Sequence, residues 1–149
     1  MRRLLLLCLT AGLAVPTASA TAATKTPVTF TDTVVTVGAP ARSWTEDGVL
    51  HVRDQPQTLT LSGDLTGSIS LDVNLDLRLE TSTGAIYGQF QIVTATITWT
   101  GSFAGTITPS GASGHFVGQG SDDTTISGTF TQTGPGAFID QANILDPHG

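Results

Sequence analysis

The sequence predicts an all-β protein, a single antiparallel barrel of about eight strands, with a β-sandwich as the alternative. Composition is the first reason: the chain holds 26 threonines but two glutamates and one lysine, so strand formers outnumber helix formers. The second is strict alternation of apolar and polar residues within residues 65–79, which is typical of a strand with one dry and one wet face. The third is a series of turn signals, rich in glycine and proline, spread along the chain.

The N-terminus carries the pattern of a secretory signal peptide, residues 1–20. A basic start is followed by an apolar run, residues 4–15, that is too short to form a membrane-spanning helix. Ala18-Ser19-Ala20 then provides a small-residue cleavage site. A lipoprotein signal at Cys8 and a retained anchor are the alternatives, but Cys8 lies inside the apolar run. We therefore expect a secreted protein, extracellular or periplasmic, without disulfides because Cys8 is the only cysteine.

Residues 21–27 are expected to form a flexible lead-in, and residues 28–149 the barrel domain. Runs of β-branched and aromatic residues between turn signals mark the strands. Residues 41–48 are expected to form a polar loop that carries Trp44, and residues 54–56 a turn. The expected strands are residues 28–37, 49–53, 58–62, 65–79, 86–98, 101–108, 114–120, 124–133 and 138–145.

Two central strands indicate a curved antiparallel sheet. The strand at residues 65–79 has one apolar and one polar face, which a parallel sheet, covered on both faces, does not permit. At about 3.3 Å per residue this strand is long enough to bend or coil, as barrel strands do. The strand at residues 86–98 changes its apolar phase from even to odd positions, which predicts a β-bulge near residues 93–95.

Glycine and phenylalanine alternate on one face of the strands in the C-terminal half. Glycine weakens a flat strand but permits tight coiling and close packing against a ring, which a small barrel needs. This rhythm favours a barrel over a sandwich. It comprises Gly101, Phe103, Gly105, Gly114, Phe116, Gly118, Gly120, Gly128 and Phe130.

Four segments carry a resemblance to a known group: Trp-Thr-Gly-Ser-Phe-Ala-Gly at 99–105, Gly-His-Phe-Val-Gly-Gln-Gly at 114–120, Ile-Ser-Gly-Thr-Phe at 126–130 and Ile-Leu-Asp-Pro-His-Gly at 144–149. They resemble uncharacterised secreted bacterial proteins that are similar to the allene oxide cyclase and dirigent-type β-barrels. The resemblance implies an eight-stranded barrel with an apolar lumen. It carries no cyclase chemistry onto this chain, because no residue here matches the catalytic residues of that enzyme family.

Five aromatic residues are candidates for the lining of a ligand-binding lumen. A barrel of about eight strands either is filled by side chains or holds one small ligand. Our first hypothesis is therefore a secreted barrel that binds a small apolar molecule. The alternative is a non-enzymatic structural or surface-interaction protein, in which the same rings fill the core. The five residues are Phe90, Trp99, Phe103, Phe116 and Phe130.

A second alternative is a cyclase- or isomerase-type enzyme, which needs ionisable side chains in the lumen. The histidines form no zinc-binding pattern, and the chain has no G-x-S-x-G nucleophile motif. We therefore assign no catalytic residue, no metal ligand and no cofactor; the question of catalysis stays open, with a protein that is not an enzyme favoured. The candidates for a polar lumen or its mouth are His51, Arg53, Asp64 and Tyr87.

Charge restricts the partners of the protein. Loss of the signal peptide, with its two arginines, changes the formal net charge from −6 to −8. Nucleic acids and anionic membranes both require a basic patch on the protein, so we expect neither as a partner. A small apolar molecule is the candidate partner, and the oligomeric state is left open.

Overall fold

The computed structural model describes residues 22–149, so the signal peptide expected at residues 1–20, with Cys8, lies outside the described residues. This part of the chain is all β. No helix in it is long and apolar enough to cross a membrane. The strands are β1 (Thr24–Val37), β2 (Arg42–Glu46), β3 (Val49–Gly63), β4 (Gly67–Arg78), β5 (Thr83–Val93), β6 (Thr98–Thr108), β7 (Gly111–Gly120), β8 (Thr125–Gly134) and β9 (Ala137–Asp146).

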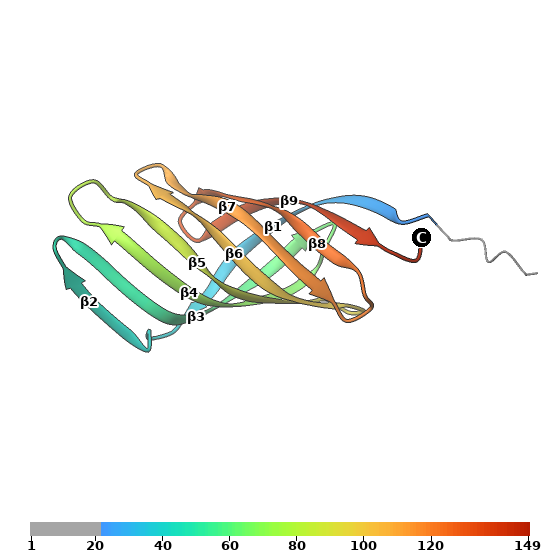
Figure 1. Cartoon of the computed structure of the whole chain (residues 1–149), viewed down its shortest axis with the longest axis horizontal. Coiled ribbons are helices and arrows are strands. Elements are labelled where there is room, and N and C mark those ends of the chain that lie inside the picture. The colour runs from blue at the N-terminus through green and yellow to red at the C-terminus, as the bar shows by residue number, and fades with distance from the viewer. Residues whose placement is uncertain (1–21) are drawn as a thin grey trace, which may run out of the picture.

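The strands close into an antiparallel barrel (Figure 1). From β3 to β9 each strand pairs with its neighbours in the chain, and β9 pairs with β1. β1 then pairs with β3, which completes a barrel of eight strands. β2 is an additional strand that pairs with the first residues of β3, Val49 to Arg53. The predicted barrel is therefore confirmed, and the sandwich alternative is wrong.

Two segments expected to lack regular structure are strands. The lead-in expected at residues 21–27 is wrong from Thr24 on, because β1 begins there and Thr24 lies opposite Asp146 of β9. The polar loop expected at residues 41–48 is also wrong, because it contains β2, whose five residues are all exposed. Neither segment has a dry face, so neither shows the alternation that marks a strand. The turn after β2 is Asp47-Gly48, with φ of 48° and 75°, the left-handed pair that a tight hairpin requires.

The turn expected at residues 54–56 and the β-bulge expected at residues 93–95 are both wrong. Residues 54–56 are not a turn: β3 continues through them, with a shift of register against β4 between Val52 and Gln55. Residues 93–95 are not a bulge, because β5 ends at Val93 and a turn leads to β6. The hydroxyl of Thr94 accepts a hydrogen bond from the Ile97 amide at 3.1 Å and so holds this turn without glycine or proline.

The inward face of every barrel strand contributes to one core. Its most buried side chains are Trp99, Phe30, Leu59 and Ile126, from four different strands. In β4 the alternation has the predicted sense, since Ile69 and Val73 are buried whereas Ser70 and Asp72 are exposed. The barrel thus directs one face of each strand at a common interior, where a site can form.

Candidate functional site

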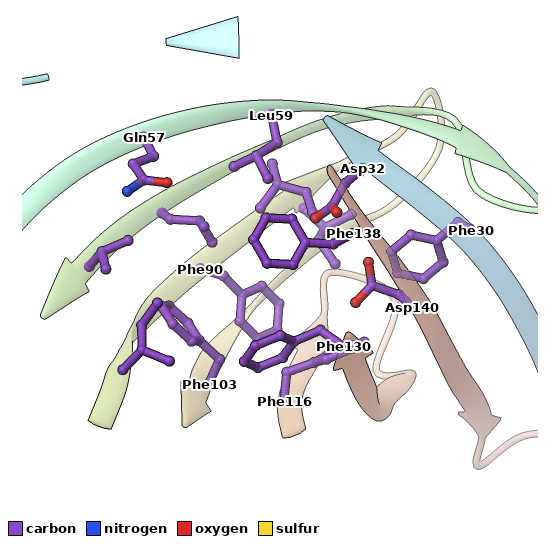
Figure 2. A pocket seen from close by; sticks show the side chains of 15 residues that line it. Phe30, Asp32, Gln57, Leu59, Phe90, Phe103, Phe116, Phe130, Phe138 and Asp140 are labelled. Atoms are coloured by element: carbon purple, nitrogen blue, oxygen red, sulfur yellow. The ribbon is translucent and has the colours of Figure 1, made fainter. Parts of the chain in front are cut away.

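The interior of the barrel is not completely filled. A cavity of about 90 Å³ remains between the strands (Figure 2). All six phenylalanines of the chain line it, although they come from six different strands. Aliphatic side chains and three polar ones complete the wall. The lining residues are Phe30, Asp32, Gln57, Leu59, Ile69, Leu71, Val73, Ile86, Phe90, Ile92, Phe103, Phe116, Phe130, Phe138 and Asp140.

Edge-to-face contacts hold the phenylalanine rings in two groups. Phe116 contacts Phe30 and Phe90, with ring centroids 6.4 and 5.8 Å apart. Phe130 contacts Phe103 and Phe138, with centroids 6.1 and 6.3 Å apart. These are favourable aromatic geometries. The wall of the cavity is therefore fixed by its own packing.

The glycine–phenylalanine rhythm has a direct structural cause. A Cβ atom on Gly118 would lie 2.7 Å from the Phe90 ring, and one on Gly114 would lie 2.7 Å from the Phe130 ring. Both distances are too short for a real side chain. The glycines thus leave room on the inner wall for the rings of neighbouring strands.

Two aspartates lie side by side on this apolar wall. Asp32 of β1 and Asp140 of β9 are 7% and 4% exposed. In the β1–β9 pair, Asp140 lies opposite Phe30 and Asp32 lies opposite Phe138, so the two aspartates are diagonal neighbours on the inner face. Figure 2 shows both carboxyl groups pointing into the space between the rings of Phe30 and Phe138.

These carboxyl groups are poorly satisfied. One oxygen of each, Asp32 Oδ1 and Asp140 Oδ2, is buried without a hydrogen-bond partner in residues 22–149. Burial raises the pKa of Asp32 to about 6. Burial, followed by the charge of Asp32, raises the pKa of Asp140 to about 8. Near pH 7 the pair therefore holds about one proton and one negative charge.

No family model and no curated protein sequence matches this chain. The chemistry of the site must therefore be argued from its own side chains. Within residues 22–149, no three His, Cys, Asp or Glu side chains are grouped so that they could hold a metal ion. An apolar cavity with two buried carboxyl groups that together hold about one proton near pH 7 can bury a hydrocarbon body and either exchange a proton or accept a positive charge.

The candidate aromatic residues divide into two sets. Phe90, Phe103, Phe116 and Phe130 line the cavity. Trp99 does not: its side chain is 1% exposed and lies in the core beside the turn between β7 and β8. Its indole Nε1 donates a hydrogen bond of 3.0 Å to the hydroxyl of Thr124 in that turn. The expectation that Trp99 faces a ligand is therefore corrected, because its ring is packed and its N–H is satisfied at that end of the barrel.

Three of the four polar candidates come together, but on the outer wall. His51 Nδ1 lies 2.5 Å from Asp76 Oδ1, and Arg53 Nη2 donates to the same oxygen at 2.7 Å. The Trp44 ring stacks on His51 at 4.8 Å, and the Arg53 guanidinium lies 5.3 Å from Trp44 and 5.8 Å from Tyr87. We call these five residues the outer cluster. They tie β2, β3, β4 and β5 together rather than line the lumen.

His51 and Arg53 lie on the outer face of β3, opposite the buried Val52, and the register shift that follows exchanges the two faces of the strand. Before the shift the odd residue His51 faces outward, opposite Asp76. After it, the odd residues Gln57 and Leu59 line the cavity. Asp64, the fourth polar candidate, is also not on the lumen wall. It lies in the exposed turn after β3, where its Oδ2 accepts a hydrogen bond from the Thr29 amide at 2.8 Å.

The sequence analysis missed the aspartate pair, although a signal for it was present. Val28, Phe30 and Val34 alternate along β1, and Asp32 falls in the same phase. Asp140 likewise falls in phase with Phe138 and Ala142 along β9. A carboxylate in the apolar phase of a strand is the pattern that marks an ionisable group inside a barrel.

Proposed function

We propose that this protein is a secreted β-barrel that binds a small apolar molecule in its lumen. The observation that carries the proposal is the cavity of about 90 Å³ whose wall includes every phenylalanine of the chain. A core that served packing alone would gain dispersion contacts by closing this space. An apolar ligand that enters such a cavity gains from leaving water and from contacts with the rings.

The ordered phenylalanine rings of the cavity wall favour the binding of a ligand over closure of the cavity by movement of side chains. Each phenylalanine of the cavity wall has an edge-to-face partner among the others. A wall that is already ordered loses little conformational freedom when a ligand enters, so more of the contact energy appears as affinity. The bound molecule would therefore meet a preformed site.

Secretion and family membership are parts of the proposal that rest on the sequence. The signal-peptide pattern of residues 1–20 would release the barrel outside the cytoplasm. The resemblance to the allene oxide cyclase and dirigent-type barrels agrees with a ligand in the lumen. With few basic residues on the mature chain, a small molecule is a better partner than nucleic acid or an anionic membrane.

A cyclase- or isomerase-type enzyme is the second candidate, and one observation favours it. Asp32 and Asp140 together hold about one proton near pH 7 inside the cavity, and a carboxyl group with a pKa near the working pH is suited to general acid–base catalysis. Conversion of the bound molecule, lost in Asp140→Asn while binding is kept, would separate this candidate from simple binding.

The test is a titration of the mature protein with toluene, followed by NMR of its backbone amides. Binding in the lumen should shift and saturate amide signals of residues that line the cavity. Val73→Phe should abolish binding, because Val73 lines the cavity and a larger ring would fill it. Val117→Phe is the matched control, since Val117 is 49% exposed on the outer wall, and it should bind as the wild type does. Absence of any saturable shift in the wild type would refute the proposal and leave the filled-core alternative.

A further inference from the structure

We propose that the lumen selects a small apolar amine, whose ammonium group pairs with Asp32 and Asp140 while its hydrocarbon body lies among the phenylalanine rings. This inference rests on the proposed function, because it names the class of molecule that the same cavity takes. It goes beyond that function in requiring one positive charge on the ligand.

The position of the two carboxyl groups is the first argument. Both side chains are more than nine-tenths buried, on neighbouring strands, and both point into the cavity. Asp32 Oδ1 and Asp140 Oδ2 find no hydrogen-bond partner within residues 22–149. An ammonium group has three N–H donors and no acceptor, so it can satisfy two converging acceptor oxygens at once.

The charge of the cavity wall is the second argument. Asp32 and Asp140 are the titratable groups among the described residues that line the cavity, and Gln57 is the other polar one. No lysine, arginine or histidine from the strands that form this wall faces the pair. A negative charge in this apolar space is therefore not balanced by the protein, and a cationic ligand would balance it.

The amount of charge fits a monovalent cation. Burial raises the pKa of Asp32 to about 6, and burial and the charge of Asp32 raise that of Asp140 to about 8. Near pH 7 the pair accordingly carries about one negative charge. Carboxylic acids, by contrast, would bring a second negative charge into the same space and should be rejected.

The aromatic neighbours of the pair are the third argument. Phe30 lies opposite Asp140, and Phe138 lies opposite Asp32. An ammonium group held between the two carboxyl groups would lie near both rings, which attract cations through their π-electrons. The wall beyond them is apolar, so the site combines one charged point with a hydrocarbon pocket.

The test compares three probes of nearly the same shape on the mature protein at pH 7, by calorimetry or amide NMR. They are benzylamine, benzyl alcohol and benzoate. Benzylamine should bind about tenfold or more tightly than benzyl alcohol, because ionic hydrogen bonds are stronger than neutral ones. Benzoate should bind least, because it brings a second negative charge beside the pair. In the double variant Asp32→Asn, Asp140→Asn the preference for the amine should fall to about twofold or less, with the affinity for benzyl alcohol kept.

The outcomes separate the two proposals. If benzyl alcohol binds as tightly as benzylamine, or if the double variant keeps the preference, the amine inference is overturned while binding in the lumen stands. If none of the probes and no toluene binds, the proposed function itself fails. Circular dichroism and thermal melting check that the double variant folds; it should melt no lower than the wild type at pH 8, because it removes a buried charge.

A pH series gives an independent reading. The affinity for benzylamine should rise between pH 5 and pH 7, as the pair ionises, and should be nearly constant in the double variant. The affinity for benzyl alcohol should change little in either protein. An amine affinity that is independent of pH in the wild type would contradict pairing with these carboxyl groups.

Discussion

Asp32 and Asp140 occupy positions where the fold favours apolar side chains, and the protein bears a cost for them. An ionised carboxylate that is buried without a full set of partners is less stable than the same group in water. Both groups respond by holding their protons to a higher pH than usual. Placing them beside each other increases the effect, because the charge of one opposes ionisation of the other.

This cost predicts that the protein becomes less stable as the pH rises. Since both pKa values are raised on folding, the folded state holds more protons than the unfolded state between about pH 4 and pH 8. The contribution of the pair is therefore full below pH 4 and is lost as the pH rises through the folded pKa values. The free energy of unfolding should fall by about 5 kcal/mol between pH 5 and pH 8, as measured by urea denaturation.

Asp140→Asn should make this pH dependence much shallower between pH 6 and pH 8, because in this range Asp140 keeps its proton in the folded state but is ionised in the unfolded state. Asp72→Asn is the control, because Asp72 is exposed on the outer face of β4 and its removal should leave the slope unchanged. A wild-type protein with constant stability from pH 5 to pH 8 would contradict the assigned burial of the pair.

At the scale of the strands, glycine positions set how closely neighbouring elements approach. Gly118→Ala should lower the free energy of unfolding by about 1–3 kcal/mol, because its Cβ would lie 2.7 Å from the Phe90 ring and 2.9 Å from the Thr100 carbonyl oxygen. Gly134→Ala, at the end of β8, is the control, since nothing lies within 4 Å of its Cβ. Chemical denaturation of both variants measures the difference, and equal midpoints would argue against close packing of Phe90 on β7.

The strands differ in how well the sequence predicts them, for physical reasons. β4 was predicted because one of its faces is dry, and such a face leaves a clear alternation. β2 was missed because both of its faces are wet. The end of β5 was misplaced because a threonine side chain, rather than glycine or proline, holds the turn after it.

The candidate site was predicted in part. The phenylalanines at 90, 103, 116 and 130 stand in the apolar phase of their strands, and such positions are reliably inward. The aspartate pair was missed because it depends on two strands far apart in sequence, and a carboxylate is ordinarily assigned to the wet face. The register shift in β3 places the odd-numbered residues His51 and Gln57 on opposite faces of the strand, so the lumen position of Gln57 depends on pairing with β4 rather than on local composition.

At the scale of the whole molecule, the barrel depends on β1, which pairs with both β3 and β9. β2 pairs with β3, and no strand within residues 22–149 pairs with its other edge. Its five residues are all exposed, so little apolar surface is lost if it opens. The fold thus joins a closed barrel to an exposed strand, β2, which pairs with β3 and contacts the rest of the outer cluster through Trp44.

Hydrogen exchange should reveal this division. Amides in the centre of β1, around Phe30, should exchange about 100-fold or more slowly than those of β2, because β2 can open without unfolding the barrel. Amide exchange followed by NMR measures both in one sample. Equal protection of the two strands would mean that β2 opens only with the whole domain.

The pairing of Thr24 with Asp146 has a consequence for connectivity. A short linker could join these two ends, and the chain could then be cut in the Gly134-Pro135-Gly136 turn between β8 and β9. Such a circular permutant would begin with β9 and β1 and could keep every strand pair. In it, Asp32 and Asp140 would belong to one hairpin, so two positions that are now far apart in sequence would become close in sequence, and their pairing could form early in folding.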